Sequence, residues 1–124
     1  MQPMQPKQSR TKSELGTIVI EKEVVARIAG LAAMECYGVV GMAAKNIRDG
    51  FVHMLKIESL SKGVRVEFLP DGGMKVGLHI IVDYGTNLAA IGTTLQENVR
   101  YAVETAIGEK VREVNVFIEG IRTE

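Results

Sequence analysis

The sequence predicts an α+β fold, a two-layer sandwich in which a mixed β-sheet has helices packed on one face. Residues 64–83 alternate apolar and polar side chains around a Pro-Asp-Gly turn, as in a β-hairpin with one buried face. Residues 21–36 and 88–108 space their apolar side chains three and four apart, as in helices with one buried side. Strands and helices in this order pack as two layers.

The predicted element order is β-α-(β)-α-β-β-α-β. Residues 1–14, "MQPMQPKQSRTKSE", are polar and predict a disordered N-terminal tail, which leaves a single domain over residues 15–124. Residues 15–20 predict the first strand and residues 21–36 the first helix. Gly38 stands where a glycine commonly ends a helix.

The next part of the chain predicts a second helix. The apolar run "VVGM" is long enough only for a brief strand. Residues 46–57 are predicted to be helical, because their apolar side chains have helical spacing. These side chains are Ile47, Phe51, Met54 and Leu55.

The C-terminal part of the chain has clearer signals. Asn87 is predicted to cap the long helix over residues 88–108, and Gly108 to end it. The last strand, residues 111–121, is predicted to place Val114, Val116 and Ile118 on one face.

The charge balance argues against a dedicated nucleic-acid binder. The 124 residues include 15 basic and 15 acidic side chains, whereas such binders normally have a basic excess on one face. Residues 1–14 carry Lys7, Arg10 and Lys12 against Glu14 alone, so the rest is mildly acidic. A basic N-terminal segment could contact an anionic lipid or a partner.

The sequence predicts a cytoplasmic protein. A single cysteine cannot form an internal disulfide, which fits a reducing compartment. The polar N-terminus does not resemble a signal peptide, and no apolar run is long enough to span a membrane. Any membrane contact is therefore expected to be peripheral or through another protein.

The chain has no motif for a metal, a cofactor or a nucleotide, and none is predicted to bind. His53 and His79 have no ligand at metal-binding spacing, and no glycine-rich phosphate loop is present. Cys36 is predicted to be a packed core residue near the C-terminal end of a helix, where the dipole disfavours a thiolate. A small enzyme using Cys36 or a histidine remains a minor alternative.

Gly38 to Gly41, "GVVG", suggests a second class of function. In KH domains a G-x-x-G loop between two helices clamps a nucleic-acid backbone, usually with basic residues beside it. Here Lys45 and Arg48 follow the motif, but its central valines offer nothing to a phosphate. A KH-like RNA-binding protein is therefore the alternative hypothesis, and nucleic acid is an improbable partner.

Four segments together resemble one family. They are "GTIVIEKEVVARIAGLAAMECYGVVGM", "LSKGVRVEF", "MKVGLHIIVDYGTNLAAIGTTLQENVRYAVE" and "VREVNVFIEGI". In this order and spacing they are similar to the alkaline shock proteins, bacterial proteins of the envelope stress response. The resemblance covers nearly everything from Gly16 to Ile121.

The resemblance implies an α+β fold and a non-enzymatic scaffold role in the response to envelope stress. It implies self-association into homo-oligomers. It also implies a cytoplasmic location near the membrane, through an integral membrane partner that carries a similar domain. The family has no established catalytic or cofactor residues to transfer to this chain.

Two parts of the sequence are candidate interaction surfaces. Asp83 and Tyr84 follow the hairpin, where Tyr84 either packs in a turn or belongs to a contact surface. Asn115, Phe117 and Glu119 would line the second face of the last strand. If that strand lies at a sheet edge, it could pair with a second copy, although Phe117 could equally belong to a second small core.

Overall fold

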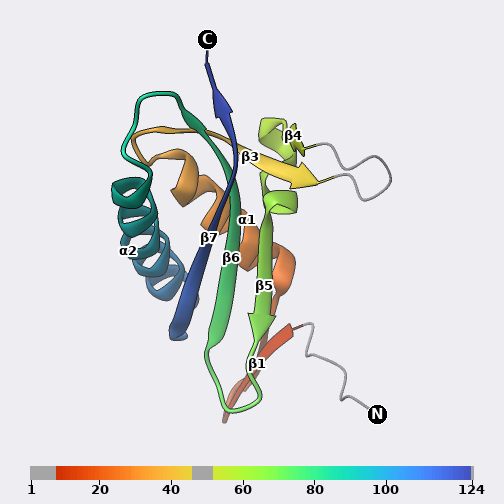
Figure 1. Ribbon diagram of the computed structural model, residues 1–124. Coiled ribbons are helices and arrows are strands. Elements are labelled where there is room, and N and C mark those ends of the chain that lie inside the picture. Colours follow the sequence, from red (N-terminus) through yellow and green to blue (C-terminus); the bar gives the residue numbers. More distant parts are fainter. Residues whose placement is uncertain (1–7, 46–51, 124) are drawn as a thin grey trace, which may run out of the picture.

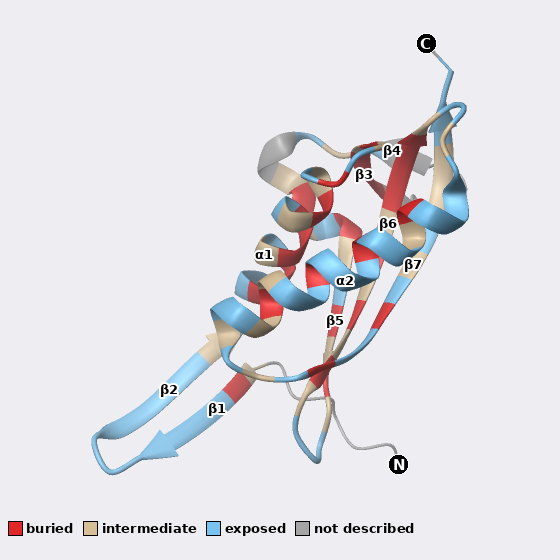
Figure 2. Ribbon diagram, turned by 90° about the vertical axis from the view of Figure 1, so that its left-hand side faces the viewer, coloured by how far each residue is buried: buried red, intermediate tan, exposed pale blue. Residues whose placement is uncertain are grey.

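Two helices lie on one face of a five-stranded sheet in the computed structural model, which describes residues 8–45 and 52–123 (Figure 1). The helices are α1 (Lys22–Met34) and α2 (Leu88–Ile107). Their apolar stripes pack on the sheet, as the buried residues in Figure 2 show. The predicted α+β two-layer sandwich is therefore confirmed.

The long strand β6 (Met74–Asp83) is the centre of the sheet. Its first half pairs antiparallel with β5 (Val64–Phe68), and its second half pairs antiparallel with β3 (Val39–Lys45). Along its other side it pairs in parallel with β7 (Val111–Arg122). The short strand β4 (Val52–Met54) extends the sheet from β3.

The core lies between the sheet and the helices. In β6 the side chains from Met74 to Val82 alternate, so that every second one is fully buried against the helices. The helices contribute Val25, Ala29, Ala33, Leu95, Val99 and Val103, all fully buried.

Helix α2 has the predicted ends. The Asn87 side chain accepts a hydrogen bond from the Ala90 N–H at 3.0 Å, and Gly108 ends the helix at a φ of 82°. Helix α1 instead ends at Glu35, so the prediction that Gly38 ends it is wrong. Gly38, at a φ of 91°, turns the chain into β3 under the side chain of Ile91.

The helix predicted over residues 46–57 is wrong wherever the structure describes it. Residues 46–51 lie outside the described residues. Val52–Met54 form β4, and a 3-10 helix, η1, follows over Ile57–Gly63. Met54 at the end of β4 packs on Gly41, and Leu55, just after the strand, packs against the core, so these neighbours point to opposite sides and not along one helical stripe.

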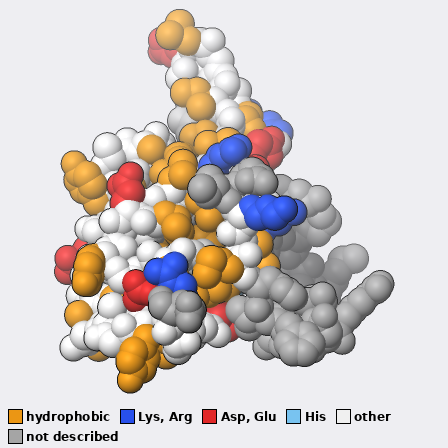
Figure 3. Space-filling model, turned by 90° about the horizontal axis from the view of Figure 1, so that it is seen from above, with side chains coloured by type: hydrophobic (Ala, Val, Ile, Leu, Met, Phe, Trp, Pro, Cys, Tyr) orange, Lys and Arg blue, Asp and Glu red, His pale blue; other side chains and the backbone are white. Residues whose placement is uncertain are grey.

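The disordered tail predicted over residues 1–14 is wrong for residues 8–13. They form β1 (Gln8–Ser13), which pairs antiparallel with β2 (Gly16–Glu21) in a separate two-stranded sheet. We call this hairpin, residues 8–21, the arm; it projects away from the body (Figures 2 and 3). β2 matches the strand predicted over residues 15–20, whereas the largely exposed side chains of β1 leave no pattern that indicates a strand. Ser9 bonds Glu109 at the base of the arm.

Candidate interaction surface

The face of the sheet opposite the helices carries a stacked pair of rings. The rings of His79 on β6 and Phe117 on β7 lie 4.8 Å apart between centroids and 12° from parallel. They meet because the parallel register sets these residues side by side. Phe117 nevertheless remains 47% exposed. The Phe117 ring thus packs on His79 and presents its remaining surface to solvent, and its part in an interface stays a prediction.

Glu119 joins this pair through an irregularity in β7. The register between β6 and β7 shifts after Ile118, so that Gly120 pairs with Ile81 and Glu119 has no partner residue. The Glu119 Oε1 atom lies 2.7 Å from Nδ1 of His79. The partly buried carboxylate therefore fixes the orientation of the imidazole under Phe117.

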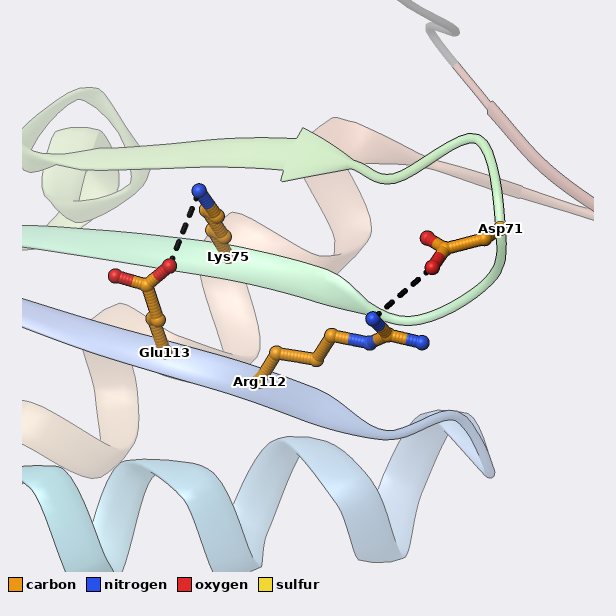
Figure 4. A network of polar contacts seen from close by, with 4 residues as sticks. All are labelled: Asp71, Lys75, Arg112 and Glu113. Carbon is orange, nitrogen blue, oxygen red and sulfur yellow. Dashed lines mark hydrogen bonds and ion pairs between the residues drawn. The ribbon is translucent and has the colours of Figure 1, made fainter.

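Ion pairs hold the first residues of β7 in place (Figure 4). Lys75 Nζ lies 3.0 Å from Glu113 Oε2, and Arg112 Nη1 lies 3.1 Å from Asp71 Oδ2 in the turn before β6. The hydrogen bond and charge of Glu113 raise the pKa of Lys75 above its ordinary value. All four side chains are substantially exposed, so the pairs set the position of β7 more than they stabilise the fold.

Asp83 and Tyr84 lie at the opposite end of the same strand pair. Asp83 Oδ1 lies 3.1 Å from Nη2 of Arg122, and the Tyr84 N–H donates to the Arg122 carbonyl at 2.9 Å. Gly85 permits the following turn at a φ of 87°. The Tyr84 side chain is 76% exposed, so it does not pack in that turn. Its role in a contact surface remains a prediction.

Strand β7 is an edge strand, because β6 is its only pairing partner among the described strands. Two α2 side chains cap the start of its outer edge. Glu104 Oε2 accepts from the Val111 N–H at 2.9 Å, and Gln96 Nε2 donates to the Val114 carbonyl at 3.1 Å. The bond from Val111 lowers the pKa of Glu104. The sequence did not indicate these caps.

The edge beyond Val114 is open. Backbone groups of a strand alternate in direction, so those of Val116 and Ile118 point the same way as the capped carbonyl of Val114. In the part of the chain that the structure describes, no other element bonds them. A groove of about 450 Å³ lies beside the capped start of β7, between α2 and residues 111–115. The last strand therefore meets the condition, an edge position in the sheet, on which its pairing with a second copy depends.

The alternative sites do not form. Gly38 to Gly41 lead into β3 and pair with β6, and Met54 covers Gly41, so the motif is not a loop between two helices. The KH-like prediction fails because its valines are strand residues. Lys45 lies in β3, and Arg48 is outside the described residues.

Cys36 is buried, as predicted. Its thiol lies 3.6 Å from the Ala32 carbonyl and 3.5 Å from Nδ2 of Asn98. Within residues 8–45 and 52–123, no three histidine, cysteine or carboxylate side chains gather as a metal site would require. Neither helix in these ranges is long and apolar enough to cross a membrane.

The fold and this surface define a class of protein, an α+β domain whose distinctive features are an open strand edge and an exposed aromatic side chain. Comparison with known families is more specific. The model of the alkaline shock protein 23 family, described as having a cell envelope-related function, matches residues 10–123. The chain belongs to this family, as its resemblance to the alkaline shock proteins predicts.

Individual relatives agree with this assignment. The chain is similar to "Uncharacterized protein YloU" of Bacillus subtilis, with 40% identity over 112 residues, 90% of this chain and 92% of the relative. It is 34% identical to "Uncharacterized protein Spy1614" of Streptococcus pyogenes over 108 residues, 86% and 88% of the two chains. No solved structure matches the chain.

Proposed function

We propose that this protein is a non-enzymatic scaffold of the cell-envelope stress response, which acts by self-association and by binding a membrane-anchored partner. The family supports a function related to the cell envelope. The open edge of β7 carries the rest of the proposal, because unpaired strand edges favour pairing with another chain.

The residues of the open edge suit such an interface. Val114 to Ile118 contain neither a charge, a proline nor a glycine, and β-branched and aromatic side chains favour strand pairing. Charged residues flank this stretch at Glu113 and Glu119. Phe117 would give the interface an aromatic contact, the type of side chain that contributes most to interfaces.

The second part of the proposal is a partner in the membrane. An integral membrane protein with a similar domain would present a similar edge and could pair in the same way. The protein would then be cytoplasmic and held near the membrane by that partner. We propose that Asp83 and Tyr84, at the end of the β6–β7 pair, add a second contact with this partner outside the strand edge.

Measuring mass against concentration tests self-association. Sedimentation velocity of the full chain is expected to show oligomers that grow with concentration. Phe117→Lys is expected to shift them toward monomer, because it places a charge beside the open edge. Thr105→Lys, a change at another exposed position, on α2, is the matched control and should leave the oligomers unchanged.

Cross-linking in cells tests the second part. A tagged chain should recover an integral membrane protein that carries a related domain, and Tyr84→Ala should reduce its yield. A chain that stays monomeric at the highest concentration, and that recovers no such protein, would refute the proposed function.

A further inference from the structure

The arm has hydrophobic side chains that the described body does not cover. Leu15 at its tip is fully exposed, and Ile18 and Val19, on opposite faces of β2, are 61% and 40% exposed. Figure 3 shows hydrophobic side chains along the projecting arm and at its tip. A two-stranded hairpin alone is at best marginally stable in water, so the arm needs a further strand or a surface to pack on.

The open edge of β7 matches the arm in length. Each strand of the arm has six residues, which span about 20 Å at about 3.3 Å per residue. Val114 to Ile118 span about 17 Å on the same scale. The groove between α2 and residues 111–115 meets this edge only at Val114 and Asn115.

The side chains of the two strands also match. β2 carries Thr17 to Ile20, a run of β-branched residues, and the open edge of β7 carries valines, an isoleucine and Phe117. Pairs of β-branched and aromatic side chains across neighbouring strands stabilise a sheet by about 0.2–1 kcal/mol each. Both partners are thus typical strand sequences that lack a neighbour on one side.

Charge favours the same pairing. The face of the arm that carries Val19 also carries two basic residues, Arg10 and Lys12, and one acidic residue, Glu21, as the register between β1 and β2 shows. If Val19 of one copy lies beside Phe117 of the other, these basic side chains project from the same face of the joined sheet as Glu113 and Glu119. Edge-to-edge pairing of two β7 strands, centred on Val116, would instead set Glu113 opposite Glu119 of the second copy, and like charges directly opposite destabilise a sheet.

We propose that the arm of one copy adds to the open edge of β7 in a second copy, with β2 beside β7. The inference rests on the self-association proposed above and names the segment that makes the contact. The two surfaces in contact are different, so each copy can give its arm and receive another. Such head-to-tail contacts extend to open chains unless they close into a ring.

An anionic membrane is a less favourable binding partner for the arm than a second copy of the chain. Only Leu15 stands at its tip, and Glu14 beside it would have to approach the lipid headgroups. Burying one leucine contributes about 1.5–3 kcal/mol, too little for stable anchoring by itself. A second copy can instead cover Ile18, Val19 and the strand edge together.

Two complementary variants test the proposal by sedimentation velocity. Val19→Lys is expected to prevent the arm of the variant from pairing with another copy. Phe117→Lys is expected to prevent β7 of the variant from pairing with the arm of another copy. Each variant alone should lose most of the assembly. An equimolar mixture should regain a dimer and nothing larger, because Val19→Lys still offers its edge and Phe117→Lys still offers its arm. Thr105→Lys should assemble like the unaltered chain.

Disulfide trapping gives an independent readout. Val19→Cys mixed with Phe117→Cys should yield a mixed disulfide dimer on oxidation, while the native Cys36 is buried and does not compete. A dominant Phe117→Cys homodimer, with Val19→Lys still assembling, would overturn the arm contact and leave self-association through β7 in place. A monomeric unaltered chain would overturn both.

Lipid vesicles test the alternative that the arm binds an anionic membrane. Val19→Lys and the unaltered chain are compared in sedimentation with phosphatidylglycerol vesicles and with neutral phosphatidylcholine vesicles. We expect equal, low binding to both. Strong binding to the anionic vesicles that Leu15→Ala abolishes, while assembly is unchanged, would refute the proposal in favour of a lipid contact.

Discussion

Replacing Gly38 by alanine tests whether the G-x-x-G motif is structural. Gly38 has a φ of +91°, and an added Cβ would lie 2.7 Å from Cδ1 of Ile91. The left-handed backbone costs an alanine about 1–2 kcal/mol, partly offset by about 0.4–1 kcal/mol from the less flexible unfolded chain. Moving the Ile91 side chain off its rotamer adds about 0.5–1.5 kcal/mol. We expect Gly38→Ala to lower the free energy of unfolding by about 2 kcal/mol.

Gly72→Ala is the matched control, because Gly72 has a similar φ of +98° and no atom within 4 Å of an added Cβ. We expect it to cost about 1 kcal/mol, the backbone contribution alone. Urea unfolding followed by circular dichroism measures both variants. Ile91→Val removes Cδ1, the methyl group that an alanine at position 38 would crowd. It should therefore lower the free energy of unfolding less in the Gly38→Ala variant than in the unaltered chain. Equal losses for both alanine variants, with no such coupling, would refute the reasoning.

Three further predictions concern the edge cap, the thiol and the core. The hydrogen bond from Val111 lowers the pKa of Glu104, so this carboxylate stabilises the fold above about pH 4.5, and its contribution disappears as the pH falls through the folded pKa. When the urea midpoint of unfolding is plotted against pH, Glu104→Gln should therefore show a smaller decrease at acid pH than the unaltered chain. Parallel curves for the two proteins would contradict this. Cys36 should react slowly with a thiol reagent until denaturant is added, and rapid labelling of the folded chain would show that it is accessible. Leu95→Ala should lower the free energy of unfolding by about 2–5 kcal/mol, because Leu95 is fully buried between the layers; a loss below about 1 kcal/mol would place it outside the core.

Elements with strong local signals were predictable from sequence. Helix α2 has a capping residue, a long apolar stripe and a terminal glycine, and all of these act within the helix itself. The hairpin of β5 and β6 likewise carries its own turn and alternation. Among the short segments, β3 was predicted only as a brief strand at "VVGM" and β4 was predicted to be helical, because both depend on pairing with strands elsewhere in the chain.

The interaction surface was partly predictable for the same reason. Alternation along the last strand placed Phe117 on the face away from the core, but the sequence left open whether this strand lies at a sheet edge. The stacking partner His79 and the edge cap Gln96 come from other elements, so only the folded chain brings them to β7. β2 of the arm was predicted as the first strand, but β1 was missed because it buries little and leaves no hydrophobic pattern.

The parallel pairing of β6 with β7 has a consequence for the order of events during synthesis. β7 follows every other strand in the chain, so a ribosome completes β1 to β6 first. Until β7 emerges, one whole side of β6 lacks its hydrogen-bonding neighbour, and α2 lacks part of the surface that it covers. A nascent chain therefore carries an exposed central strand for a time, and that strand, rather than β7, is where premature pairing with another polypeptide would do most harm.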